Sequence, residues 1–349
     1  MPRLPKVVQA LLNPQIYPES APAVEMVQTQ MSFVFLAGDY VYKIKKPVNL
    51  GYLDYTTLSQ RHFYCQREVE LNQRLCPDTY LGLVPITRNR GDILLDGGGR
   101  VIEYAVKMRY LPQDRMMNVL LVKKQVSAAM VAQVAQKLAA FHHQAATDAT
   151  ISAFGELDAI RVNTEENFSQ TLPYIGNTIS EAQYRHIKDY TNSFIANNAP
   201  LFARRVAEGK IRDCHGDLHA AHICFTPSIN SLSRSSVQAG QADDICIYDC
   251  IEFNDRFRYC DVASEIAFLA MDLDHYGRLD LSRSFVEAYV SSSRDKELLQ
   301  LLSFYKCYRA YVRGKVEGFK LDDPHISAEE KIKILAVARS YFELAEGYV

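Results

Sequence analysis

Runs of alternating apolar and polar residues in the first third of the chain predict six β-strands. The predicted strands cover residues 24–30, 32–37, 40–45, 83–87, 92–95 and 101–108. Gly97-Gly98-Gly99 predicts a hairpin between the last two of them. Because side chains alternate between the two faces of a strand, Lys43 and Lys45 are expected on the same face of the third strand.

Helical spacing of apolar residues predicts one helix between these strands and a mainly helical chain after Pro112. The first helix covers residues 59–75, carries Glu68 and ends at Cys76-Pro77. Ser180 has the hydroxyl group that commonly caps a helix N-terminus. The later helical segments are residues 126–141, 164–208, 262–273 and most of the chain beyond.

The order of these elements predicts an α+β fold of two lobes, in which a small antiparallel sheet with one helix precedes a larger helical part. The protein has 349 residues, which is enough for this arrangement. The first lobe is placed at residues 1–109 and the second at residues 110–349. Two short strands near residues 221–225 and 245–249 interrupt the helical lobe. Between them, residues 226–244 are rich in Ser, Gln and Gly and are expected to form an exposed, mobile insertion.

Composition narrows the classes of protein to which the chain can belong. A net charge of -2 gives no reason to expect a nucleic-acid partner. No run of eighteen apolar residues predicts a membrane span, and the apolar run near the N-terminus is too short for a signal peptide. The 8 cysteines have no closely spaced framework and are expected to be reduced thiols. We therefore expect a cytoplasmic protein, whose oligomeric state the sequence leaves open.

The sequence His215-Gly216-Asp217 carries the strongest chemical signal in the chain. With a polar side chain five residues after Asp217, it has the spacing H-x-D-x-x-x-x-N of a kinase catalytic loop. Asp249 follows the next short apolar strand, where such a site has its metal-binding carboxylate. We therefore predict that Asp217 orients the attacking hydroxyl, that Asp249 binds the metal and that His215 holds the loop through backbone hydrogen bonds.

A kinase-type site also needs a strand lysine that binds the phosphates and a helix glutamate that holds this lysine. Lys43 and Glu68 are the predicted pair, and Lys45 and Glu70 are the runners-up. The alternative is that the lysines form a solvated charge run on an edge strand, which would discourage aggregation.

Further nucleotide contacts are predicted at two places. Ser32 lies beside the turn between the first two strands, where its hydroxyl and the backbone amides can face phosphate oxygens. Met108 and Tyr110 lie where the last strand enters the helices, and their backbone can bind a nucleotide base. A glycine-rich G-x-G-x-x-G loop is absent, and so is a P-loop.

A cluster of cysteines and histidines and a group of carboxylates could each form a binding site. A cysteine- and histidine-rich cluster could ligate zinc, although its spacing matches no zinc signature. This cluster consists of Cys214, His215, His219, His222 and Cys224. A group of carboxylates in the helical lobe would either line an acidic pocket for a cationic substrate or form a solvated helical face. These carboxylates are Glu252, Asp255, Glu265, Asp272 and Asp274.

At these residues the chain resembles the aminoglycoside phosphotransferase family, a branch of the protein-kinase-like fold, and especially its bacterial subfamily of unknown substrate. The resemblance covers nearly the whole chain as a kinase module, from Phe33-Val-Phe-Leu-Ala-Gly-Asp through His215-Gly-Asp-Leu-His to Asp249-Cys-Ile-Glu-Phe. It implies a five-stranded N-terminal lobe, a helical C-terminal lobe, and ATP with Mg²⁺ in the cleft. It also implies that Asp217 and Asp249 are the catalytic and metal aspartates and that Asp261 supports the catalytic loop.

His222 departs from the family pattern, which has Asn at this position. An imidazole nitrogen suits Mg²⁺ less well than an amide oxygen does, so Mn²⁺ is considered beside Mg²⁺ as the partner of His222 and Asp249. The leading prediction is an ATP-dependent phosphotransferase that acts on a small-molecule hydroxyl, for example that of an amino sugar or an aminoglycoside-like compound. The alternative is a nucleotide-binding pseudokinase that regulates or binds a partner.

Overall fold

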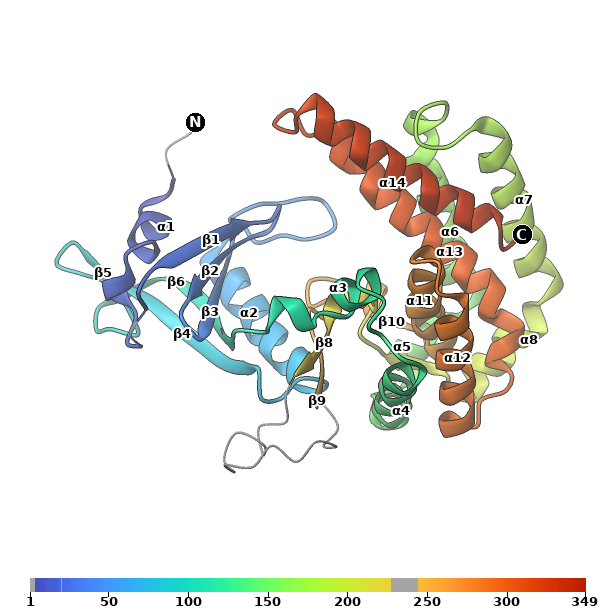
Figure 1. Ribbon diagram of the computed structural model, residues 1–349, viewed down its shortest axis with the longest axis horizontal. Helices are drawn as coiled ribbons and strands as arrows, with labels where there is room; N and C mark the ends of the chain where they lie inside the picture. The colour runs from blue at the N-terminus through green and yellow to red at the C-terminus, as the bar shows by residue number, and fades with distance from the viewer. Residues whose placement is uncertain (1–3, 20, 227–243) are drawn as a thin grey trace. The chain divides into compact units, whose positions relative to one another are not determined.

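The computed structural model describes residues 4–19, 21–226 and 244–349 (Figure 1). The chain divides into two units, residues 1–119 with 221–255 and residues 120–220 with 256–349. The segment that leads to Asp249 thus belongs to the same unit as the predicted strands of the first lobe. The boundary between residues 109 and 110 stays a prediction, and nearly all of the insertion expected at residues 226–244 lies outside the described residues.

The first unit is built around a curled antiparallel sheet with the strand order β1-β2-β3-β6-β4-β5 (Figure 1). The strands are β1 (Val24–Gln28), β2 (Ser32–Ala37), β3 (Tyr40–Lys45), β4 (Tyr80–Asn89), β5 (Asp92–Leu95) and β6 (Arg100–Arg109). All six predicted strands are present, which is one more than the resemblance implied. β3 pairs with β2 on one side and with β6 on the other, so the interpretation of Lys43 and Lys45 as residues of an edge strand is wrong.

The prediction of a hairpin at Gly97-Gly98-Gly99 is also wrong. β5 pairs with β4, and Arg90-Gly91 makes the turn between these strands, with φ values of 49° and 106°. The glycine segment instead carries the chain to β6, which lies on the other side of β4. Gly99 approaches β4 so closely that an added Cβ would lie 2.5 Å from the carbonyl oxygen of Arg88.

Helix α2 (Leu58–Gln73) packs on one face of this sheet. Thr57 and Gln60 form a capping box at its N-terminus. Cys65 and Val69 of α2 join Val41 of β3 in one apolar cluster. The opposite face packs against α1 (Lys6–Leu11), a short helix that the sequence did not predict.

A second, small sheet in this unit pairs β8 (Ile223–Thr226) with β9 (Asp244–Ile247), and Cys224 lies opposite Cys246. Cys246 forms a disulfide with Cys76, which follows α2. The expectation of reduced thiols is therefore wrong for this pair. Their sequence separation is 170, so tertiary packing alone brings them together. The other six cysteines all lie in the described ranges and are thiols.

The second unit is mainly helical. The α-helices that follow β6 are α3 (Met117–Val122), α4 (Ala128–Gln144), α5 (Ala149–Ser152), α6 (Leu157–Thr171), α7 (Glu181–Asn197), α8 (Ala199–Ala207), α10 (Asp255–Arg258), α11 (Val262–His275), α12 (Leu279–Ser293), α13 (Leu298–Phe319) and α14 (Ala328–Glu346). β7 (Ile211–Asp213) pairs with β10 (Tyr259–Asp261). Ser180 caps α7 together with Gln183, which confirms the predicted cap. Across the described ranges, no helix is long and apolar enough to cross a membrane.

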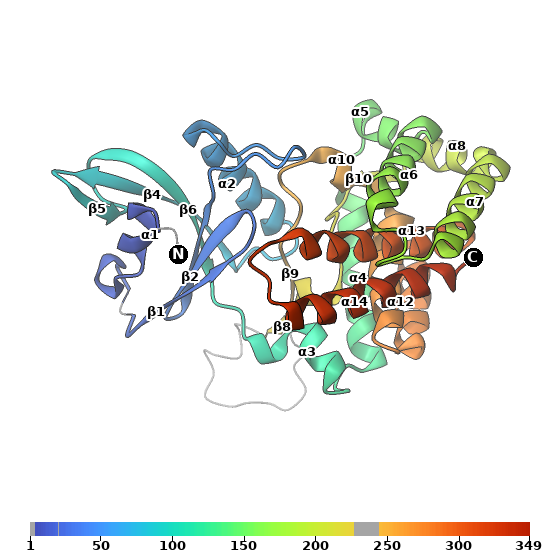
Figure 2. The same ribbon diagram turned by 90° about the horizontal axis from the view of Figure 1, so that it is seen from above.

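Helix α11 forms the centre of this unit. Every residue from Val262 to Asp274 is buried. α12 and α13 pack against α11, and α13 and α14 lie side by side in both views (Figures 1 and 2). Because α11 is covered on all sides, its polar side chains need partners inside the protein.

Arg205 of α8 is a buried cation that joins three segments of this unit. Its guanidinium donates two hydrogen bonds to Asp261, at 2.9 and 2.7 Å, and two to Asp295, at 2.7 and 2.8 Å. Asp261 in turn caps α11 by accepting the amide of Ala263 at 2.8 Å. The network ties α8, the start of α11 and the segment before α13 together.

Replacing Arg205 by Met is expected to lower the free energy of unfolding by about 3–5 kcal/mol, because Asp261 and Asp295 would stay buried without a counter-charge. Urea denaturation measures this change. Arg185→Met is the control, since it removes an exposed pair with Glu181 and is expected to change stability by less than about 0.5 kcal/mol. Equal losses in the two variants would contradict the proposed importance of the buried network.

Candidate functional site

Glu68 of α2 binds two lysines of β3 inside the first unit. Its Oε1 lies 2.9 Å from Nζ of Lys43, and its Oε2 lies 2.7 Å from Nζ of Lys45. The carboxylate is completely buried. The structure therefore brings the predicted pair of Lys43 and Glu68 together, and it adds the runner-up lysine. Glu70, the runner-up glutamate, instead pairs with Arg67 at 3.3 Å.

The two lysines differ in their surroundings. Lys45 is only 2% exposed, forms an ion pair with Glu252 and lies 3.5 Å from the hydroxyl of Tyr55. That hydroxyl donates to Glu252 at 2.7 Å, which closes a buried polar cluster. The side chain of Lys43 keeps 18% of its surface exposed and lies 3.0 Å from Oδ1 of Asp249. Lys43 is thus the accessible lysine of the two.

These contacts keep the lysines charged. Burial alone would lower the pKa of Lys43, but the carboxylates of Asp249 and Glu68 raise it well above the ordinary lysine value. Burial opposes the ionised form of Glu68 as well, yet Lys43 and Lys45 lower its pKa below the ordinary value. The group is an array of ion pairs that is buried at Glu68 and Lys45 and accessible at Asp249.

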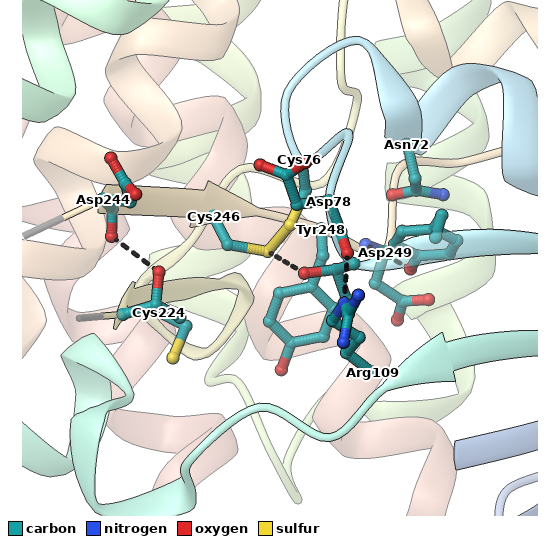
Figure 3. Close-up of a disulfide and its surroundings, with 12 residues drawn as sticks. Asn72, Cys76, Asp78, Arg109, Cys224, Asp244, Cys246, Tyr248 and Asp249 are labelled. Carbon is teal, nitrogen blue, oxygen red and sulfur yellow. Dashed lines mark hydrogen bonds between the residues drawn. A yellow bond between two sulfur atoms is a disulfide. The ribbon is translucent and has the colours of Figure 1, made fainter. Parts of the chain in front are cut away.

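Asp249 follows β9 in an unusual backbone conformation. Its φ is 61°, a left-handed value that few residues with a side chain adopt. The hydroxyl of Tyr80 accepts its amide at 3.3 Å, and Oδ1 of Asn72 accepts the amide of the next residue, Cys250, at 2.9 Å. Since Asn72 belongs to α2, the helix that carries Glu68 also fixes the backbone beside Asp249 (Figure 3).

His222 lies next to Asp249 in the first unit. Its Nε2 is 3.6 Å from Oδ2 of Asp249, and its carbonyl oxygen accepts the amide of Tyr248 at 3.0 Å. The Asp249 side chain is 42% exposed. An imidazole nitrogen and an accessible carboxylate oxygen at this separation can bind one divalent cation together, with the nitrogen favouring Mn²⁺ over Mg²⁺.

The segment that carries Asp217 is held from α11 of the second unit. Oε1 of Glu265 accepts the amides of His215 and Gly216, both at 2.7 Å. Oε2 of Glu265 lies 2.6 Å from Nε2 of His142. Gly216 has a φ of 91°, which a residue with a side chain would adopt only with strain. A buried carboxylate thus fixes the backbone immediately before Asp217.

Further contacts fix both sides of Asp217. Its amide donates to Nδ1 of His215 at 3.3 Å, and its Oδ2 lies 3.5 Å from Nε2 of His219. The amide of Ala220 donates to Oδ2 of Asp272 at 2.8 Å. Glu265 and Asp272 are seven residues apart, so they lie on one face of α11 and hold the two ends of this loop.

Sequence reasoning missed Glu265 as the anchor of the loop. Asp261, to which this role was assigned, binds Arg205 and the start of α11, whereas Glu265 holds the loop amides. The available signal was the position of Glu265 in the first turn of an apolar helix, four residues after Asp261, because a glutamate on a buried helix must find partners inside the protein.

The carboxylates considered for an acidic pocket are mostly buried and occupied. Glu252, Glu265, Asp272 and Asp274 are at most 8% exposed, so the interpretation as a solvated helical face is wrong for these four. Asp274, for example, binds Lys306 at 2.8 Å and the hydroxyl of Tyr348 at 2.5 Å. Because each of these four carboxylates is buried and already has at least one internal partner, they do not by themselves indicate an acidic pocket that selects a cationic substrate.

The other predicted nucleotide residues lie in well-defined backbone contacts. Ser32 is buried, and its amide donates to the hydroxyl of Thr29 at 2.9 Å. Met108 lies in β6 opposite Val41. The amide of Tyr110 donates to the carbonyl oxygen of Asp39 at 2.9 Å. The nucleotide contacts of Ser32, Met108 and Tyr110 stay predictions.

One buried group in the second unit has the residue types of a metal site. The ligand atoms of His142, Cys214 and Glu265 lie within 4.8 Å of one another. Both nitrogens of His142 already have partners, Glu265 at 2.6 Å and the hydroxyl of Tyr289 at 2.7 Å. Burial raises the pKa of Cys214 well above its ordinary value, which disfavours the thiolate that zinc requires. This group therefore fits a structural hydrogen-bond network better than a zinc site.

Comparison with known sequences finds relatives in mycobacteria. The chain is 32% identical over 326 residues to uncharacterised proteins of Mycobacterium tuberculosis and Mycobacterium bovis. The alignment covers 93% of this chain and 61% of each relative, so the chain spans about three-fifths of their length. No family model matches the chain.

Comparison with solved structures identifies the fold. A candidate aminoglycoside phosphotransferase from Ralstonia eutropha matches with a TM-score of 0.50 and 12% identity over 98% of this chain and 97% of that chain. A choline/ethanolamine kinase family protein from Mesorhizobium loti gives 0.49 with 13% identity over 98% and 97%. A glucosamine kinase gives 0.44 with 16% identity over 95% and 80%. The chain has an aminoglycoside-phosphotransferase-like, protein-kinase-like α+β fold, which confirms the predicted fold class.

The ionisation of Glu265 predicts a dependence of stability on pH. Burial raises its pKa, but the hydrogen bond and charge of His142 outweigh burial and lower the pKa from 4.5 to about 2. The stabilisation is therefore complete above about pH 4.5 and is lost as the pH falls towards 2. Glu265→Gln is expected to cost on the order of 3 kcal/mol at pH 7 and progressively less towards pH 2.

Urea denaturation at a series of pH values measures this difference. Glu329→Gln is the control, because that carboxylate is exposed and pairs with Lys333 on its own helix. A stability difference for Glu265→Gln that stays constant from pH 7 to pH 2 would contradict the assignment of a depressed pKa.

Proposed function

We propose that the protein is a phosphotransferase that moves the γ-phosphoryl group of ATP to a hydroxyl of a small molecule. The observation that carries the proposal is the ion-pair array in which Lys43 contacts both Glu68 and Asp249, at 2.9 and 3.0 Å. A strand lysine held by a helix glutamate beside an accessible carboxylate is the arrangement that phosphoryl transfer requires of a kinase-type protein. A cytoplasmic location, where ATP is available, is part of the same proposal.

Each residue has a separate role in this proposal. Lys43 binds phosphate oxygens, and Glu68 keeps the ammonium group in place. Asp217 accepts a hydrogen bond from the acceptor hydroxyl and takes up its proton as the new oxygen–phosphorus bond forms and the bond to ADP breaks. Because the transition state is loose, the contribution of Asp217 is mainly to orient the hydroxyl.

The proposal includes a divalent cation at Asp249. The carboxylate is accessible and suits a hard cation, and the neighbouring nitrogen of His222 makes Mn²⁺ a better match than Mg²⁺. A bound cation would neutralise charge on the phosphates. In the proposal, Asp249 and His222 hold this cation. Lys43 either keeps its contact with Oδ1 of Asp249 or turns towards the phosphates.

The acceptor is proposed only as a hydroxyl compound. The resemblance makes an amino sugar one class to test, but the buried carboxylates of α11 do not argue for a cationic acceptor in particular. A second candidate function is a nucleotide-binding pseudokinase. The replacement of Asn by His222 beside Asp249 favours it, because loss of one metal site can leave nucleotide binding without transfer.

The proposed reaction is tested by a screen of hydroxyl metabolites, amino sugars and aminoglycosides with labelled ATP and either metal. Asp217→Asn is expected to lower turnover by at least about 100-fold, since it removes the proton acceptor, and to leave ATP affinity in calorimetry nearly unchanged. Asp158→Asn is the matched control, because its carboxylate lies on the surface of α6, and it is expected to behave like the parent protein.

Three outcomes of this screen have different meanings. Turnover that depends on Asp217 supports the enzyme. ATP binding without turnover of any acceptor, unchanged by Asp217→Asn, would overturn the enzyme and favour the pseudokinase. Absence of ATP binding in the presence of either metal would overturn both functions.

The role of His222 is tested separately by metal preference. His222→Asn is expected to shift the preference from Mn²⁺ towards Mg²⁺, because an amide oxygen replaces a nitrogen ligand. Calorimetric titration of ATP with each metal measures the shift, and His186→Asn, an exposed histidine of α7, is the control. An unchanged ratio of the two metal affinities would show that His222 is no ligand.

A further inference from the structure

The disulfide between Cys76 and Cys246 joins two parts of the candidate site within the first unit (Figure 3). Cys76 follows the last turn of α2, the helix that carries Glu68. Cys246 lies in β9, three residues before Asp249. The two Cα atoms are 4.7 Å apart, and both residues are only 4% exposed. One covalent bond thus connects the helix of the lysine-binding glutamate to the strand of the proposed metal carboxylate.

Polar contacts also run parallel to this bond. Asn72 of α2 accepts the amide of Cys250 at 2.9 Å, and Nη2 of Arg74 lies 3.4 Å from Sγ of Cys250. The surroundings of the disulfide include the apolar side chains of Leu111 and Met116 and the hydroxyl of Thr79, which lies 3.6 Å from Sγ of Cys246. Because apolar packing is not directional, the covalent bond is the contact there that most strictly fixes the distance between α2 and β9.

The remaining cysteines argue against a general disulfide framework. All eight cysteines lie in the described ranges, six of them are thiols, and five of these six are buried. A protein stabilised throughout by disulfides would pair most of its cysteines. A bridge among so many thiols, placed at the functional residues, is the pattern of a reversible bridge rather than of a scaffold.

We propose that Cys76 and Cys246 form a reversible thiol–disulfide site that controls how firmly Glu68 and Asp249 are held around Lys43. In the oxidised protein the bridge fixes the end of α2 against β9, which preorganises the array for nucleotide. In the reduced protein these segments keep only their non-covalent contacts, and nucleotide binding must then order them. The consequence for nucleotide rests on the proposed function, whereas the bridge and its effect on α2 do not.

A low-molecular-weight disulfide can oxidise Cys76 and Cys246 to the bridge. The thiolate of one cysteine attacks this disulfide and expels one small thiolate, which leaves a mixed disulfide. The thiolate of the second cysteine attacks the protein sulfur of the mixed disulfide and expels the other small thiolate. The two protein thiols give up two protons, which the two expelled thiolates take up. A dithiol reductant reverses the sequence.

The first measurement does not use nucleotide. Protein treated with oxidised glutathione or with dithiothreitol is alkylated and analysed by mass spectrometry, and hydrogen exchange is followed in α2 and in residues 244–250. Reduction is expected to break the Cys76–Cys246 bridge, to speed exchange in both segments and to be reversed by oxidised glutathione. A bridge that does not form under oxidation, or exchange that is the same in both states, would overturn the proposal.

The second measurement is calorimetry of ATP with Mn²⁺ in the two redox states. Reduction is expected to weaken binding roughly 5-fold or more, the lower end of typical coupling between two sites. Cys76→Ser and Cys246→Ser are expected to have the reduced affinity and no redox response. Cys224→Ser is the matched control, because Cys224 lies opposite Cys246 but directs its sulfur to the carbonyl oxygen of Pro112 at 3.7 Å.

Failure of this inference and failure of the proposed function give different results. Equal ATP affinities in both redox states would overturn control of the array while leaving the phosphotransferase intact. Absence of ATP binding in both states would overturn the proposed function, and the exchange measurement would then decide on the redox site by itself. A redox response lost equally in Cys224→Ser would exclude the Cys76–Cys246 pair as its cause.

Discussion

The buried carboxylate of Glu68 is the interaction on which the first unit depends. A buried ion is tolerated only when opposite charges compensate for its lost hydration. Glu68 has two such partners, Lys43 and Lys45, and these lysines in turn hold Asp249 and Glu252. The register of β3, the position of α2 and the course of the chain after β9 are therefore coupled, because the buried charges of Glu68, Lys45 and Glu252 compensate one another.

The helical unit also contains a buried carboxylate whose partners fix the structure around it. Glu265 is completely buried, and its oxygens accept two backbone amides and face the ring of His142. Backbone amides are fixed dipoles, so a carboxylate that accepts them positions the main chain itself rather than a flexible side chain. Asp217 can then remain partly exposed, because the rigidity of its loop comes from a neighbouring buried carboxylate.

The sequence predicted what depends on local periodicity and little of what depends on distant partners. The strands, the common face of Lys43 and Lys45 and the Ser180 cap follow from spacing within a few residues. The anchor role of Glu265 and the bridge between Cys76 and Cys246 did not follow, because their partners lie at least 49 and 170 residues away. Carboxylates also look alike in a sequence, whether they face water or a buried amide.

The surroundings of Asp249 distinguish the two lysines. Lys45 is enclosed by Glu68, Glu252 and Tyr55, so moving its ammonium group would leave Glu252 buried without its cation and remove one of the two partners of Glu68. Lys43 shares Glu68 with Lys45, and its second partner is the accessible Asp249. A cation bound at Asp249 would compensate that carboxylate and leave Lys43 to phosphate oxygens while Glu68 retained it. Lys45 then serves to keep Glu68 in place, and Lys43 is the phosphate lysine of the proposed function.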